Sequence, residues 1–581
     1  MSEKEVVENQ IVEKPKKKRR FKKFLKVVGI VFASLIALIL ILVFIFNKII
    51  FSGIGMYIKQ DRLFSYSCSE YEERHLTKEQ MLSDFEYLYD HLYTNSLVKD
   101  QAEKYLDFDY DKIYEEYKER ISNCEDEYEF YANLVSLNAK LPGGHSFVAA
   151  PQDHLTSTFP LGEEIGDKEV IDTNYSYYKQ FEDRMFSYDQ KFVYFCYLNG
   201  EYITLYDNFD EEELIPGIKD AKLLTLDGKD VNDMIGELDT IQKYGYDAGN
   251  DRMFVSELVF NDGVGTKYVA EIELPDGTIV TKDLYNCCEH VTATYFKKRI
   301  YPDHYASEKE TQEDNNVETE ENKPSEIKRC YSIEKVPERN LVIVSIAQCV
   351  SADTQAVFDD ITAALKEVDA TTVIIDNRNN KGGTYTFATK GICPAIFSHD
   401  YEYKSYSVAP KNDLTDLLYS NAFYSTILEH GLKRNDDNYT YYENFSFEGK
   451  AEKEYDIYVL NGASTFSSGD ILAGVLKDQP NVTTIGNNTG GEGYSGHPMD
   501  FYLPESKFPV TYSFSVSVNH PDDNYLGTTA DIFVANGWDN WMKRREILDD
   551  PNFDGNVKSF ENRLKWDAVM IEAVRLIDSK K

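Results

Sequence analysis

The chain of 581 residues lacks the short patterns that assemble metal sites. It contains no Cys-x-x-Cys pair, no His-Glu-x-x-His segment and no EF-hand loop, which are spacings that bring metal ligands together. We therefore expect neither a metal ion nor a cofactor. The chain also lacks an internal repeat of the kind that builds solenoids, which argues against that class of fold.

Cysteine is scarce, and its eight positions run from Cys68 to Cys393 without the dense spacing of a disulfide framework. Cys287 and Cys288 are adjacent and cannot easily bond to each other. A chain of this length can bury enough apolar surface to fold without covalent cross-links. The sequence leaves open whether any of the cysteines pair.

Positive charge is scarce after the first 26 residues. The net charge is −38, and residues 1–26 hold ten of the 62 lysines and arginines against four glutamates, which leaves −44 for the remainder. Such an acidic remainder repels phosphate groups, so nucleic acid and anionic lipid headgroups are not expected as partners. Nothing in the composition predicts the oligomeric state.

One long apolar run is present, at residues 27–46, and it is about long enough to cross a bilayer. Lysines and arginines precede it. The positive-inside rule therefore predicts a cytoplasmic tail at 1–26, a single transmembrane helix at 27–46 in the cell membrane, and an extracellular remainder. A cleaved signal peptide is the alternative, but the run is long for one and no clear small-residue cleavage site follows it.

Helical, β-rich and acidic segments follow one another after residue 70. Residues 70–150 carry apolar side chains at helical spacing. Residues 190–290 are rich in strand-forming residues and contain a hairpin signal at 275–277. Residues 304–328 are acidic and have no apolar period, which predicts a disordered insertion. The helical stripes are Met81, Phe85, Leu88 and Leu92; Ile113, Tyr117 and Ile121; and Phe130, Leu134, Leu137 and Leu141.

Residues 330–581 alternate buried strands with amphipathic helices. Strands are expected at 341–347, 372–375, 456–460 and 482–485, and helices at 353–368, after Ser467 and at 569–577. A strand, a helix and a strand in this order form a right-handed crossover between parallel strands. We therefore predict an α/β domain with a parallel sheet.

Three turns carry residues suited to chemistry. One places Ser467 at a helix N-terminus, where unpaired backbone amides favour negative charge. Another, residues 376–383, ends in a glycine pair whose amides can approach a ligand closely. The third, residues 141–146, contains His145. Taken singly, Ser467 could be a simple helix cap and His145 a packed turn residue.

From about Leu76 to its end, the chain resembles the tail-specific, or C-terminal processing, serine peptidases. Residues 376–383 resemble the family's D-x-R-x-N-x-G-G signature. Residues 465–470 resemble its T-x-S-x-x-E nucleophile turn, and residues 487–493 its following T-x-G-x-G turn. Residues 141–146 are similar to the L-x-D-G-H-[ST] segment of the branch with a histidine base, which includes the tricorn protease core and retinoid-binding-protein-like modules.

The resemblance implies a fold. Residues 330–581 would form a ClpP/crotonase-like spiral α/β catalytic domain, preceded by the helical region at 70–150. The β-rich segment at 190–290 occupies the position of the family's PDZ-like module. The glycine-hydrophobic loop that captures a peptide carboxylate in such modules is not found in it.

The resemblance also implies catalytic roles. Ser467 would be the nucleophile and His145 its general base. The backbone amide of Ser468, with that of Gly382 or Gly383, would bind the oxyanion of the intermediate.

The chain departs from the family pattern at several positions. Glu492 stands where many relatives carry a catalytic lysine, and a carboxylate cannot replace an amine as a base of comparable strength. Either His145 is the base or the protein is inactive. Glu492 would then orient His145, with Asp531 as the alternative orienter and His497 as an alternative base. Gly144 differs from the tricorn pattern, in which a catalytic serine adjoins the histidine.

The sequence therefore predicts a membrane-anchored extracellular serine endopeptidase that cleaves peptide or protein substrates through an acyl-enzyme on Ser467. The alternative is a catalytically inactive family member that acts as an extracellular peptide-binding or scaffold protein. An acyl-CoA enzyme on the related spiral fold is disfavoured, because nothing basic is placed to meet the phosphates of CoA.

Overall fold

The computed structural model describes residues 72–151, 168–186, 191–205, 214–300, 329–413, 415–416, 433–434, 437–493, 495–517, 527–553 and 555–580. The tail predicted at 1–26, the membrane helix at 27–46 and the acidic insertion at 304–328 lie outside these ranges. Within them, no helix is both long and apolar enough to span a bilayer.

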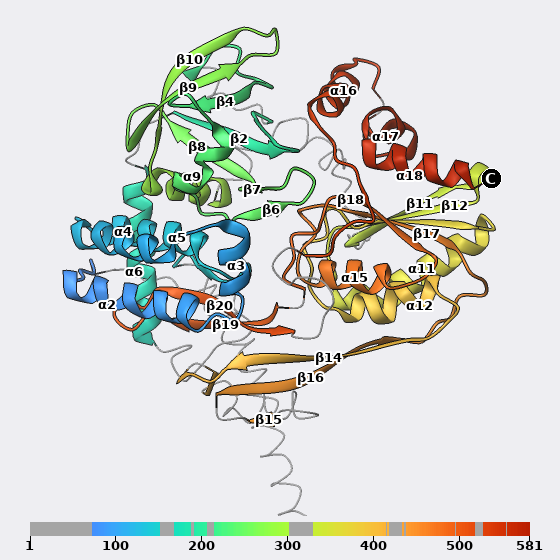
Figure 1. Ribbon diagram of the computed structural model, residues 1–581, viewed down its shortest axis with the longest axis horizontal. Coiled ribbons are helices and arrows are strands. Elements are labelled where there is room, and N and C mark those ends of the chain that lie inside the picture. Colours follow the sequence, from blue (N-terminus) through green and yellow to red (C-terminus); the bar gives the residue numbers. More distant parts are fainter. Residues whose placement is uncertain are drawn as a thin grey trace, which may run out of the picture. The chain divides into compact units, whose positions relative to one another are not determined.

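A six-stranded sheet forms the centre of the C-terminal half (Figure 1). The four strands expected from the sequence are present and run parallel: β12 (Leu341–Ile346), β13 (Thr372–Asp376), β17 (Asp456–Asn461) and β18 (Val482–Gly486). β21 (Ile532–Phe533) extends the parallel set beside β18, and β11 (Tyr331–Val336) is the antiparallel neighbour of β12. The predicted α/β class is confirmed.

Helices cover both faces of this sheet, which is why its strands read as continuous apolar runs. Successive residues of β12 alternate between the two cores: Val342 and Val344 pack on one side, Leu341 and Ile343 on the other. The first core contains α11 (Thr354–Glu367), α12 (Cys393–Ile396), a π-helical turn at Phe387–Ile392 and α15 (Ser468–Lys477). The second contains α17 (Phe560–Trp566), which follows α16 (Trp538–Asp549), and α18 (Ala568–Ser579).

The three helices expected in residues 70–150 are α2 (Lys78–Tyr89), α4 (Tyr110–Asn123) and α5 (Glu127–Lys140), and α3 (Lys99–Leu106) is an additional helix that was not predicted. Thr77 and Gln80 form a capping box at the start of α2. The first apolar stripe outlasts this helix, because Leu92 lies in a π-helical turn at Asp90–Thr94.

A second sheet connects these helices to the α/β core. Its strand β16 contributes Phe447 to the α/β core and Tyr439 to the core of the helices. The hairpin of β19 and β20 adds Phe501, Phe508 and Tyr512 to the helical core. Residues from beyond position 330 therefore complete the N-terminal core. The strands are β1 (Phe147–Val148), β14 (Tyr401–Pro410), β15 (Lys433–Arg434), β16 (Asn438–Phe447), β19 (Ser495–Tyr502) and β20 (Pro509–Ser517).

The β-rich segment forms a seven-stranded antiparallel sheet in the order β3-β2-β8-β10-β9-β4-β5. The predicted turn at 275–277 joins β9 to β10, which confirms that hairpin. The strands are β2 (Phe192–Leu198), β3 (Glu201–Ile203), β4 (Lys222–Leu226), β5 (Lys229–Asp230), β8 (Glu257–Asn261), β9 (Thr266–Glu273) and β10 (Ile279–Asn286). A separate hairpin is formed by β6 (Gly245–Asp247) and β7 (Arg252–Phe254). The helix α6 (Lys168–Phe186) precedes this segment, α8 (Val231–Met234) lies within it, and α9 (Cys288–Ile300) follows its last strand.

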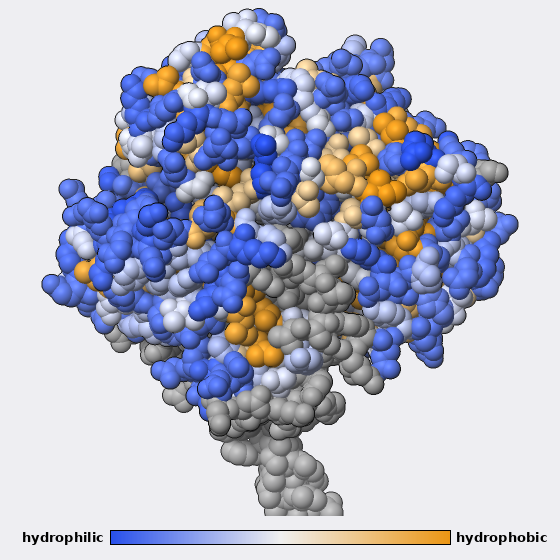
Figure 2. Space-filling model, viewed as in Figure 1, coloured by the Kyte–Doolittle hydropathy of each residue, from blue (hydrophilic) through white to orange (hydrophobic). Residues whose placement is uncertain are grey.

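The surface and the thiols agree with the composition. Hydrophilic side chains dominate the face shown in Figure 2, in line with the net charge of −38. The seven cysteines among the described residues are free, and most are buried. Cys124, Cys349 and Cys393 pack in the hydrophobic cores as small apolar side chains.

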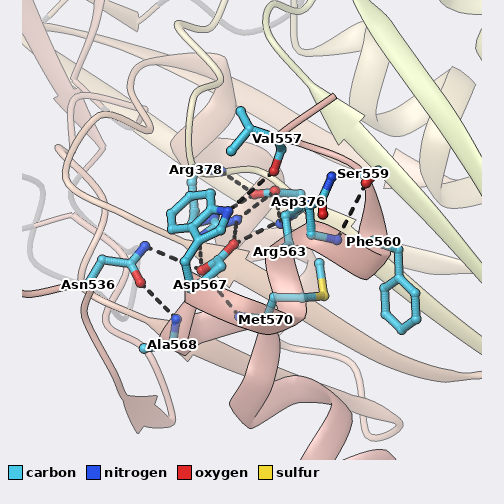
Figure 3. Close-up of polar contacts among 12 residues, drawn as sticks. Asp376, Arg378, Asn536, Val557, Ser559, Phe560, Arg563, Asp567, Ala568 and Met570 are labelled. Atoms are coloured by element: carbon cyan, nitrogen blue, oxygen red, sulfur yellow. Dashed lines mark hydrogen bonds and ion pairs between the residues drawn. The ribbon is translucent and has the colours of Figure 1, made fainter. Parts of the chain in front are cut away.

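Two arginines and two aspartates fasten the C-terminal helices to the end of β13 (Figure 3). The Arg378 guanidinium donates to both carboxylate oxygens of Asp376, at 2.8 and 2.9 Å, and to both of Asp567, each at 2.8 Å. Arg563 contacts the same two carboxylates at 2.5 and 3.1 Å. Burial raises the pKa of Asp376 and of Asp567, but the two guanidiniums outweigh it and hold both pKa values below their usual range.

Replacing Asp567 by alanine should lower the free energy of unfolding by about 3–5 kcal/mol, because it leaves buried guanidiniums without their partner. Urea denaturation at pH 7 measures this loss. Asp578 on α18 is the matched control, since its pair with Arg339 at 2.9 Å is half exposed; Asp578→Ala should cost about 0–1 kcal/mol.

The same pair of variants tests the pH dependence. A carboxyl whose folded-state pKa is depressed contributes stability above its unfolded pKa, near about 4, and loses it as the pH falls further. The deficit of Asp567→Ala should therefore stay constant from neutral pH down to about 5 and shrink below about 4. A deficit that grows on acidification would contradict this assignment.

Candidate active site

The turn between β17 and α15 presents Ser467 in an unusual backbone conformation. Ser467 is the N-cap of α15 and has φ 56° and ψ −126°, a region that side-chain-bearing residues rarely adopt. Buried Asp470 fixes the turn by accepting hydrogen bonds from the Thr489 hydroxyl at 2.6 Å and the Thr528 amide at 3.0 Å. The aspartate that replaces the family's glutamate thus makes structural contacts.

Two backbone amides lie beside this serine. Ser468 begins α15, so its N–H has no acceptor within the helix. The Ser468 hydroxyl donates to the Gly383 carbonyl at 2.6 Å, which holds the glycine pair against the helix N-terminus. The Gly382 amide donates to Asn380 Oδ1 at 3.0 Å, whereas among the described residues no acceptor is found for the Gly383 amide.

The glycine turn packs so closely on Ser467 that a side chain cannot fit. A Cβ on Gly382 would lie 2.6 Å from Ser467 Cβ and 2.6 Å from the Phe466 carbonyl oxygen, and Gly382 has φ +84°. Two asparagines of the 376–383 segment, to which the sequence assigned no catalytic role, reinforce this contact. Asn377 Nδ2 donates to the Gly469 carbonyl at 2.9 Å and Asn380 Nδ2 donates to Asn377 Oδ1 at 2.9 Å.

His145 and Glu492 meet although 347 positions separate them in the sequence. His145 follows the C-terminal end of α5. Its Nδ1 lies 3.1 Å from Glu492 Oε2, and the other carboxylate oxygen accepts the Gly144 amide at 2.7 Å. Glu492 is buried with 4% of its surface exposed, and it has φ 63°. The carboxylate fixes both the ring and the backbone that precedes it.

The pair lies next to the serine turn. The Ser467 amide donates at 3.0 Å to the carbonyl of Gly491, which immediately precedes Glu492. The ring of Phe466 lies 4.8 Å from the ring of His145, centroid to centroid. Among the described contacts none is a hydrogen bond between His145 and Ser467. Such bonds often tighten only when substrate binds.

The other candidates lie elsewhere. The Asp531 carboxylate accepts from the Thr484 amide and from its hydroxyl, both at 2.9 Å, so it fastens β21 to β18 and does not contact His145. Ser146 is buried, and its hydroxyl accepts from the Ser513 amide at 3.0 Å. The side chain of His497 lies outside the described part of the structure.

A cavity of about 310 Å³ lies beside the pair. Gly144, Glu492 and Phe466 of the serine turn line it. Tyr246 and Phe254, from the hairpin of β6 and β7, also line it. The cavity therefore brings the β-rich segment to the site.

The comparison with known families decides the class. Residues 340–518 match the family model described as Peptidase family S41. This region of the chain is therefore similar to peptidase family S41. The match indicates a serine peptidase. The matched residues include the glycine turn, Ser467 and Glu492, but not His145.

The solved structures that the chain matches include mature CPAF in complex with lactacystin, which is 14% identical with a TM-score of 0.45; the match covers 86% of this chain and 99% of that one. The photosystem II D1 C-terminal processing protease is 13% identical, with a TM-score of 0.32 and coverage of 79% and 94%. The tricorn protease is 12% identical, with a TM-score of 0.29 and coverage of 86% and 37%. No curated protein matches the chain. The assignment of the peptidase therefore rests on the family match.

Substituting Gly382 by alanine should slow covalent labelling of the peptidase by a fluorophosphonate at least tenfold, since the new Cβ displaces the serine turn by part of an ångström. Gly228→Ala is the control. Gly228 has a similar φ of +77° but nothing within 4 Å of an added Cβ, so this variant should lose about 1 kcal/mol of stability and label normally. Equal labelling of both variants would contradict the packing described.

Proposed function

We propose that the chain is a serine endopeptidase that cleaves peptide or protein substrates through an acyl-enzyme on Ser467, with His145 as general base. The observation that carries this proposal is the position of Glu492. Its buried carboxylate accepts from the Gly144 amide and contacts His145 Nδ1. A carboxylate so placed selects the tautomer with the proton on Nδ1 and leaves Nε2 free to accept one.

The proposed reaction follows from these positions. The Ser467 hydroxyl attacks the scissile carbonyl while His145 Nε2 takes its proton. The oxyanion forms beside the amides of Ser468 and Gly383, and donors of this kind typically contribute about 10²–10³ in rate. His145 then returns the proton to the leaving amine, and water hydrolyses the acyl-enzyme by the same route.

Glu492 suits this role because of its charge. When His145 takes the proton, a cation develops within hydrogen-bond reach of a buried carboxylate, where an opposite charge is stabilising. A lysine at position 492 would instead place a second cation beside the imidazolium. We infer that the replacement of the family's lysine accompanies a change of base from lysine to histidine.

The remaining assignments are proposals of the same kind. The apolar run at 27–46 would anchor the chain in the cell membrane with the peptidase outside. The sheet of residues 330–581 would be the spiral catalytic domain of the family. The β-rich segment, as a PDZ-like module, would present the substrate to the cavity beside Glu492.

Fluorophosphonate labelling of the whole chain tests the roles of the residues. Ser467→Ala should abolish labelling and peptide hydrolysis, whereas Ser468→Ala should still label, because its backbone amide remains, but more slowly, because it loses the contact with the Gly383 carbonyl. His145→Ala should lower kcat by at least about 10³-fold. Wild-type protein that is folded but neither labels nor hydrolyses peptides would favour an inactive, peptide-binding protein instead.

The two acidic candidates can be separated by conservative variants. Glu492→Gln removes the charge that stabilises the imidazolium and should lower kcat by about 10²–10⁴-fold. Asp531→Asn should leave kcat within about twofold, because its contacts are confined to Thr484. The reverse ranking would assign the orienting role to Asp531.

A further inference from the structure

Lys243 caps the helix that leads to His145. It stands in the β-rich segment just before β6, and its Nζ donates to the carbonyls of Asn138 and, at 2.8 Å, of Leu141. These carbonyls end α5, where the helix cannot satisfy its own acceptors and where a positive charge is favoured. The lysine therefore fixes the point at which the chain leaves α5.

Asn138, whose carbonyl Lys243 binds, also contacts the residue after His145. The side chain of Asn138 donates through Nδ2 to the Ser146 carbonyl at 3.1 Å. The Asn138 carbonyl is thus bound by Lys243, and the Asn138 side chain in turn binds the residue that follows His145. A shift of Asn138 would move the whole turn that carries the imidazole.

The same segment contacts the turn that carries Glu492. The Tyr246 carbonyl accepts from Asn488 Nδ2 at 2.9 Å, and the Ala248 amide donates to Asn488 Oδ1 at 3.1 Å. Asp247 Oδ1 accepts from Asn487 Nδ2 at 3.1 Å. Residues 243–248 therefore contact both loops whose meeting forms the pair of His145 and Glu492.

Lys243 is not itself placed as a base. Among the described residues no carboxylate lies within 4 Å of its Nζ, and the nitrogen is engaged by two carbonyls. It lines the same cavity as Glu492. Burial lowers the pKa of Lys243 to about 7, and the negative charge of Glu492 opposes this shift.

We propose that Lys243 is a positioning residue for catalysis: by capping α5 while its neighbours bind Asn487 and Asn488, it aligns His145 with Glu492. The proposal rests on the proposed roles of those two residues. It makes residues 243–248 of the β-rich segment part of the apparatus that positions the catalytic residues.

The test compares Lys243 with Lys140, using the whole chain and a peptide substrate. Lys140 is a matched control because it is a buried lysine that lies in the last turn of α5 and donates to a carbonyl of the β-rich segment, that of Gly236 at 3.1 Å. Lys243→Met should lower kcat at least about tenfold with KM within about threefold, since a displaced base impairs the chemical step rather than binding. Lys140→Met should keep the wild-type kcat below its unfolding temperature.

Two more variants make the result decisive. Lys243→Arg keeps a cation with several donors and should recover most of the lost kcat. Asn488→Ala removes the hydrogen bonds that Tyr246 and Ala248 make with the loop of Glu492, and it should also lower kcat with little change in KM. This variant decides the question alone if Lys243→Met does not fold. Wild-type kcat in every folded variant among Lys243→Met and Asn488→Ala would overturn the proposal.

The proposed function is checked separately in the same series. Activity of the wild type that is lost in Ser467→Ala and His145→Ala establishes the roles on which the inference depends. If those variants stay active, the proposed function fails. If they are inactive but Lys243→Met has the same kcat as Lys140→Met, only the positioning role of Lys243 fails.

Discussion

The candidate active site depends on one buried carboxylate. Glu492 contacts His145 and the Gly144 amide, which lie almost 350 positions earlier in the chain. A buried carboxylate is costly unless its oxygens are paired, and here both pairs involve the turn that carries the imidazole. The interaction that satisfies Glu492 is therefore the same one that places the His145 imidazole beside the serine turn.

A second ionic network fixes the position of the glycine turn. Asp376 and Arg378 belong to the signature that leads to Gly383, and both are held by Arg563 and Asp567 from the C-terminal helices. Because the four side chains satisfy one another, the loop leaves β13 in one direction. The end of the chain thus contributes to the site without supplying a reacting group.

Many helices, strands and turns could be predicted from the sequence, but the contacts between distant segments could not. The parallel strands and α11 follow from apolar periodicity, and the turn at 275–277 from its residue types. The packing of β19 and β20 on α2 and α5 has no local signal, since it joins segments some 400 residues apart. The sequence did not indicate a role for Lys243 either, because a lysine in a polar stretch is usually solvated. The family signature identified Ser467 and Glu492, but only the structure ranks Glu492 above Asp531 as the neighbour of His145.

The glycine before His145 and the glutamate at position 492 depend on each other. Glu492 stands where many relatives carry a lysine, and Gly144 matches the glycine of the L-x-D-G-H-[ST] segment. A Cβ on Gly144 would lie 2.6 Å from Glu492 Cγ, closer than atoms can approach. The carboxylate can reach the Gly144 amide and His145 only because position 144 carries no side chain. The absence of a side chain at position 144 is therefore the condition under which a glutamate at position 492 can contact the loop of His145.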